Sequence, residues 1–131
     1  MLDDSEPPLT RSWSAKFGDA FRGVREEIHS QRSFRVHFAA GLAVIVCGFA
    51  LRVNLLEWCV LLLCIIGVFI AEMFNTAMEA LARAITRKLN RHIALALDVA
   101  SAAVLMASIG AAMVGAIVFI NRLGILLRWW G

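Results

Sequence analysis

The chain has 131 residues, of which 60% are hydrophobic, with a mean hydropathy of +0.75, no Tyr and only 2 Pro. This composition excludes an ordinary soluble domain of this size and indicates an integral membrane protein, while the formal net charge of +3 is spread unevenly along the chain. The length predicts one domain, and a chain this short cannot enclose a large core alone, so we expect an oligomer. No nucleic-acid partner is expected.

The first segment of interest is the amino-terminal region. Residues 1–10, MLDDSEPPLT, are acidic and lack an apolar run, so no cleavable signal peptide is indicated and residues 1–12 are predicted to be a disordered leader. An amphipathic helix that lies in the membrane interface is predicted next, although an ordinary soluble surface helix is the alternative. Its apolar residues recur every three or four positions: Trp13, Phe17, Phe21, Val24 and Ile28.

Three apolar segments follow, at residues 36–51, 58–71 and 99–120. Each is interpreted as a transmembrane helix, and the helical pattern of the second continues to about residue 85. Small residues repeat every four positions along the third segment and predict close helix packing. They are Ala103, Ala107, Ala111 and Gly115. The cysteines, Cys47, Cys59 and Cys64, lie within apolar runs and are interpreted as packing residues.

The predicted fold is therefore all-α and membrane-embedded, with one interfacial helix and three transmembrane helices. Residues 13–122 form the domain, and residues 123–131 form an interfacial tail anchored by Trp129 and Trp130. Basic residues predict the orientation, because cytoplasmic segments carry an excess of Lys and Arg. The amino-terminal region and the segment between the second and third spans are rich in them, whereas the loop between the first two spans has only Arg52. Both rich segments should be cytoplasmic.

A polar stripe ends the second apolar segment, within the residues IAEMFNTAMEA. Its members Glu72, Asn75, Thr76 and Glu79 share one helix face. Carboxylates near membrane depth suggest a proton path, a metal site or a site for a polar head group, and this spacing beside a basic loop could hold Mg²⁺ and a polyphosphate. The alternative is a polar cluster that holds helices together by hydrogen bonds. The motifs of soluble nucleotide-binding sites are absent.

Three stretches, SQRSFRVHFAAG, EMFNTAMEALARAI and LDVASAAVLMA, resemble the small prokaryotic diacylglycerol kinase family, which includes undecaprenol kinases. The resemblance covers roughly residues 14–120, and FRVH is closer to the undecaprenol type. It implies a homotrimer in the bacterial inner membrane, multi-pass, with its active site on the cytoplasmic side. It also implies transfer of the γ-phosphate of ATP, with Mg²⁺, to a lipid hydroxyl.

The same resemblance implies roles for individual residues. Glu72 matches the catalytic carboxylate that accepts the proton of the lipid hydroxyl, and Glu79 matches a Mg²⁺ ligand that also faces ATP. Asn75 matches an amide of the same site. Gln31 stands where the second metal-binding carboxylate is found in the best-known members, and therefore joins the predicted metal and nucleotide ligands.

The resemblance also places residues around the nucleotide and the lipid. Lys88, Leu89 and Asn90 align with a loop that touches the nucleotide, and Asp98 with a nucleotide contact before the third span. Arg35 and Ser101 are assigned to the lipid substrate.

Three positions depart from the family pattern. Gln31 removes a negative charge and should weaken Mg²⁺ binding by itself. Leu97 replaces a common Lys, so the positive charge missing there would have to come from Arg87, Lys88 or Arg91. Arg83 stands where an acidic residue is common. The hypotheses are a kinase acting on undecaprenol, a kinase acting on diacylglycerol, and a degenerate membrane protein without enzymatic activity.

Overall fold

The computed structural model describes residues 12–85, 88 and 90–129, and the side chain of Ser30 is not among the described groups. The described residues form four helices, α1 (Trp13–Ser30), α2 (Arg32–Ala50), α3 (Leu55–Ile85) and α4 (Arg91–Leu126). The predicted leader lies outside the described residues except for Ser12, and so does Trp130. The Ser12 hydroxyl accepts a hydrogen bond from the Ala15 amide at 3.2 Å and thereby caps the first turn of α1.

Three of these helices are long and apolar enough to cross a membrane, as predicted. The helix α3 continues without a break from its apolar half through the polar stripe. The helix α4 begins before and ends after the predicted residues 99–120. At 1.5 Å per residue, α3 and α4 are about 46 and 54 Å long, so both extend well beyond a hydrocarbon core of about 30 Å.

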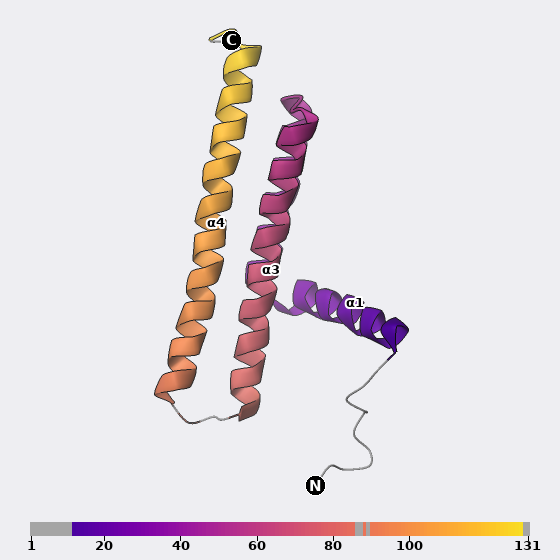
Figure 1. Ribbon diagram of the computed structural model, residues 1–131, viewed down its shortest axis with the longest axis vertical. Coiled ribbons are helices and arrows are strands. Elements are labelled where there is room, and N and C mark those ends of the chain that lie inside the picture. The colour runs from indigo at the N-terminus through magenta and orange to yellow at the C-terminus, as the bar shows by residue number, and fades with distance from the viewer. Residues whose placement is uncertain (1–11, 86–87, 89, 130–131) are drawn as a thin grey trace.

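The helices α3 and α4 lie side by side and run in opposite directions along most of their length (Figure 1). Glycines let α2 approach α3 closely. A Cβ atom on Gly48 would lie 2.5 Å from the Trp58 ring, and one on Gly41 would lie 3.3 Å from the Ile65 side chain. Tight packing in the described chain therefore occurs at glycines of α2.

The predicted small-residue ridge of α4 behaves differently. A Cβ atom on Gly115 would meet nothing within 4 Å, and Ala103 is exposed. Gly115 therefore makes no close helix contact within the described chain, and packing of the ridge against another helix stays a prediction. This part of α4 borders a cavity, which is described below.

The helix α1 runs across the direction of α3 and α4 and meets the bundle beside the second half of α3 (Figure 1). Its large apolar side chains are uncovered, and Trp13 and Phe21 are 74% and 76% exposed. A helix with an uncovered apolar face that lies across the spanning helices has the geometry of an interfacial helix. Figure 1 also shows that α3 and α4 continue past the level of α1 at the end where they are connected.

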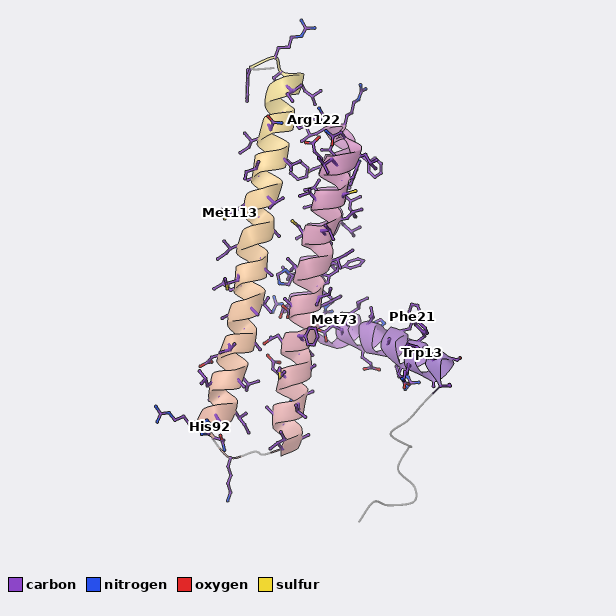
Figure 2. The ribbon with its side chains drawn as sticks, viewed as in Figure 1. Trp13, Phe21, Met73, His92, Met113 and Arg122 are labelled. Atoms are coloured by element: carbon purple, nitrogen blue, oxygen red, sulfur yellow. The ribbon has the colours of Figure 1, made fainter. Side chains whose placement is uncertain are left out.

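The other end of the bundle is closed by polar contacts. Asn54 and Glu57 cap the start of α3 reciprocally, because each side chain accepts the backbone N–H of the other, at 2.8 and 3.0 Å. Arg122 of α4 donates to the carbonyl of Arg52 at 2.6 Å and lies 3.7 Å from the Glu57 carboxylate. Figure 2 shows Arg122 at this end, opposite His92.

Candidate active site

The polar stripe of α3 lies at the level where α1 joins the bundle, near the labelled Met73 (Figure 2). Glu72 is only 4% exposed, whereas Asn75, Thr76 and Glu79 are half-buried. Burying a carboxylate costs free energy unless other groups hydrogen-bond to it or neutralise its charge. The groups that contact Glu72 therefore indicate the function of the site. The α1 and α2 helices provide these partners together with α4.

Glu72 faces α2. The Nε2 atom of His37 lies 3.5 Å from Oε2 of Glu72, and the His37 side chain is itself about three-quarters buried. His37 is the last residue of the FRVH stretch, and α2 positions it toward the stripe. The contact places a group that can donate a hydrogen bond, or carry a proton, beside the carboxylate.

Glu27 of α1 is a site residue that the sequence analysis did not identify. It is 6% exposed, and its Oε1 atom accepts a hydrogen bond of 2.7 Å from the Thr76 hydroxyl. Burial raises the pKa of Glu27 most strongly, repulsion from Glu72 and Glu79 raises it further, and the hydrogen bond from Thr76 opposes the rise. Glu27 therefore belongs to the same electrostatic site as the stripe.

Asn75 connects Glu79 to α4. Its amide nitrogen donates to Oε1 of Glu79 at 3.3 Å, and its amide oxygen accepts from the Ser101 hydroxyl at 3.4 Å. The structure thus brings together four residues that the resemblance assigned to the site, namely Glu72, Asn75, Glu79 and Ser101. Ser101 acts here as the residue that orients the Asn75 amide, and through it the Glu79 carboxylate.

The structure does not join three other predicted site residues to this group. Gln31 is half-buried at the junction between α1 and α2, one helical turn after Glu27. Asp98 and Arg35 are exposed on α4 and α2. None of these three shares a recorded hydrogen bond or ion pair with the stripe.

The connection between α3 and α4 holds the remaining predicted nucleotide contacts. Lys88 is exposed, and Leu89 lies outside the described residues. The Asn90 side chain caps α4, because its oxygen accepts from the amides of His92 and Ile93 at 2.9 and 3.3 Å. Capping accounts for the Asn90 oxygen and leaves its amide N–H groups for other contacts.

An apolar cavity of about 420 Å³ lies among α2, α3 and α4. His37 lines it and so connects it to Glu72. Ala111 and Gly115 form part of its α4 wall, and Ser108, also in the wall, has a buried hydroxyl without a hydrogen-bond partner among the described residues. A cavity of this size and polarity accommodates an apolar ligand with one polar end.

The family resemblance implies Mg²⁺, and the donor set can be compared with what this ion requires. Carboxylate and amide oxygens are its preferred ligands, and in kinases it is usually held by one or two carboxylates together with phosphates. In the described part of the chain no group of three Asp, Glu, His or Cys side chains is close enough to hold a metal by itself. The Glu79 carboxylate and the Gln31 amide are oxygen donors of the kind that Mg²⁺ takes, and its remaining ligands would have to come from the phosphates of a nucleotide.

These features define a class of protein: a membrane protein with a buried carboxylate on a spanning helix at the level of α1, flanked by an apolar cavity and by further acids. The sequence profile of the prokaryotic diacylglycerol kinase family matches residues 18–119, and the chain belongs to this family of lipid kinases.

Two relatives show the extent of the similarity. The undecaprenol kinase of Bacillus subtilis is 35% identical over 107 residues, which cover 82% of this chain and 87% of the relative. The diacylglycerol kinase of Synechocystis sp. is 36% identical over 100 residues, which cover 76% of this chain and 57% of the relative.

Proposed function

We propose that this protein transfers the γ-phosphoryl group of ATP to the hydroxyl of a membrane lipid, with undecaprenol as the favoured acceptor. One observation carries the proposal. The buried carboxylate of Glu72 belongs to the residue before Met73, which lies at the level where α1 meets α3 (Figure 2), and it contacts His37, which also lines the apolar cavity. A lipid chain in the cavity would bring its hydroxyl to the same depth as Glu72.

The residues have distinct parts in the reaction. Glu72 accepts the proton of the lipid hydroxyl as the lipid oxygen bonds to the γ-phosphorus. The bond between that phosphorus and the β,γ-bridging oxygen breaks, and ADP leaves with the electron pair. His37 holds the Glu72 carboxylate in position, and the Asn75 amide holds Glu79 toward the nucleotide. Mg²⁺, when bound by Glu79 and Gln31, supplies neutralisation of phosphate charge.

Undecaprenol is preferred over diacylglycerol for two reasons. The undecaprenol kinase relative matches over most of its own length, whereas the match to the diacylglycerol kinase covers 57% of that protein. In addition, the FRVH stretch places His37 at the head of the cavity. Only the end of a long prenol that bears the hydroxyl would enter this cavity, and the rest of the chain would stay in the bilayer.

The location and assembly complete the proposal. The basic segments before α2 and between α3 and α4 favour a cytoplasmic site in the bacterial inner membrane, where ATP is available. Other copies of the chain can cover part of the uncovered apolar surface of the spanning helices, and the family resemblance makes a homotrimer the expected assembly.

The test is phosphoryl transfer from radiolabelled ATP to undecaprenol and, separately, to diacylglycerol by the purified protein in mixed micelles. Glu72→Gln should lower turnover about 10²-fold or more, the usual contribution of a general base, while MgATP binding stays nearly intact. Glu26→Gln, which neutralises an exposed acid of α1, is the matched control and should keep wild-type turnover.

Two results would contradict the proposal. Normal turnover by folded Glu72→Gln protein would reject Glu72 as the base. The absence of labelled product from the wild-type protein with either lipid would support a degenerate, non-enzymatic membrane protein instead.

A further inference from the structure

Glu27 is buried on a helix whose other described faces are largely open. It is 6% exposed, while its neighbour Glu26 is exposed and the apolar side chains of α1 are uncovered. Burying one carboxylate of a pair of adjacent acids requires a specific environment. That environment is the polar stripe of α3, which Glu27 reaches through its 2.7 Å hydrogen bond from Thr76.

The position of Thr76 determines what Glu27 faces. Thr76 lies between Glu72 and Glu79 on one helix face, so a carboxylate bound to its hydroxyl lies beside the face that carries both acids. Across the described residues, no lysine or arginine forms an ion pair with any of these three glutamates. His37 is their only basic contact there. Three carboxylates with so little positive charge leave an excess of negative charge at the site.

The neutral side chain of Gln31 suggests a role for the negative charge of Glu27. Gln31 caps the end of α1 four residues after Glu27, at the position where the resemblance places a metal-binding carboxylate, and it is neutral. We propose that Glu27 supplies the negative charge that Gln31 lacks, so that Glu27 joins Glu79 and the Gln31 amide in holding the divalent cation of the bound nucleotide. This inference rests on the proposed function, because the cation is the one that accompanies ATP.

A structural role for Glu27 makes a different prediction. If Glu27 only holds α1 against α3, Mn²⁺ binding should depend on the hydrogen bond from Thr76 and not on the charge of the Glu27 carboxylate. Glu27→Gln separates the two roles, since an amide oxygen still accepts from the Thr76 hydroxyl but carries no charge. Thr76→Val does the reverse, because it removes the donor and leaves the carboxylate.

The experiment measures the affinity of Mn²⁺ together with the non-hydrolysable nucleotide AMP-PNP for the full-length protein in lipid nanodiscs, by electron paramagnetic resonance. Glu27→Gln should weaken Mn²⁺ binding about tenfold or more, the loss typical when even an indirect partner of a metal ligand is removed. Glu26→Gln should bind like the wild type. The double variant Glu27→Gln with Gln31→Glu should regain most of the affinity, and Thr76→Val should lose less than Glu27→Gln.

Several results would overturn the inference. Wild-type Mn²⁺ affinity in Glu27→Gln, or no recovery in the double variant, would show that Glu27 does not act on the cation. If Glu27→Gln does not fold, Glu27→Ala also removes the carboxylate, and wild-type Mn²⁺ affinity in that variant would count equally against the idea. Wild-type protein that binds Mn²⁺ with AMP-PNP but phosphorylates no lipid would refute the proposed function and leave this inference standing.

Discussion

Thr76 occupies the middle of the polar stripe and joins two helices through a single hydroxyl. Its hydrogen bond to Glu27 brings an acid of α1 to the acids of α3, and the Asn75 amide beside it connects α3 to Ser101 of α4. Neighbouring residues of one helix thus hold side chains from two others. The site depends on these short polar side chains as much as on its carboxylates.

The pKa of Glu27 predicts how stability changes with pH when no divalent cation is present. Because burial and repulsion raise this pKa above its ordinary value of 4.5, the folded protein favours the neutral acid. The stabilising contribution is complete below about pH 4.5, and it is lost as the pH rises through the raised pKa. The groups facing Glu27 are Thr76, Glu72 and Glu79, all from α3.

Thermal unfolding of detergent-solubilised protein, followed by circular dichroism in steps from acid to neutral pH, checks this prediction. The wild-type melting temperature should fall over that interval relative to Glu27→Gln, which cannot ionise at this position. Parallel curves for the two proteins would show that ionisation of Glu27 does not affect folding.

Sequence reasoning at the residue scale found the stripe and missed Glu27. The stripe was predictable because Glu72 and Glu79 follow an apolar run at helical spacing, where charge is expensive. Glu27 stands among charged residues of an amphipathic helix, where an acid usually faces water. Only the docking of α1 on Thr76 distinguishes it from Glu26, and that contact spans 49 positions of sequence.

At the scale of helices, small residues of α4 form part of the wall of the apolar cavity. Ala111 and Gly115 were expected to let helices touch, whereas within the chain they leave room beside His37 and Ser108. Hydropathy also underestimated the length of α4, because it marks only the part that suits hydrocarbon, while backbone hydrogen bonding continues into the polar ends. Close approach occurs instead at Gly48, against Trp58.

Filling the cavity should affect the lipid more than the nucleotide. Ala111→Leu adds three carbons to the cavity wall and should lower the rate of lipid phosphorylation roughly tenfold or more, as expected for steric change in an apolar pocket. Affinity for MgATP should stay unchanged. Ala103→Leu is the control, because Ala103 belongs to the same ridge but is exposed and does not line the cavity.

Kinetics with varied lipid and varied ATP would measure both effects. If Ala111→Leu instead disrupts assembly or stability while folded protein retains normal lipid kinetics, the ridge packs against another helix and the cavity is not the lipid site.

At the scale of the whole molecule, one chain leaves most of its apolar surface uncovered. Only four described hydrophobic residues are buried, and the apolar stretch of α4 contributes none of them. The bilayer covers part of this surface, and other copies of the chain are expected to cover the rest. The number, order and type of the helices followed from hydropathy and periodicity, whereas the contacts between helices depended on a few polar side chains far apart in sequence.

Chemical cross-linking in native lipid should yield trimers in excess of dimers, because the family resemblance implies a homotrimer. The physical reason is that a small protein with uncovered spanning helices gains packing contacts by association. Native mass spectrometry of the same preparation would count the subunits independently. A strictly monomeric species with full kinase activity would contradict the predicted assembly.

The contacts of Arg122 at the end of the bundle have a consequence for the order in which the helices insert into the membrane during synthesis. A guanidinium near the membrane is costly until it is paired, and Arg122 finds its partners in the Arg52 carbonyl and the Glu57 carboxylate. Those partners leave the ribosome well before α4 does, so the turn that receives Arg122 can already be in place when α4 inserts. Synthesis from the amino terminus thus makes the Arg52 carbonyl and the Glu57 carboxylate before the Arg122 guanidinium that they bind. The helix α4 can therefore insert with the partners of Arg122 already present.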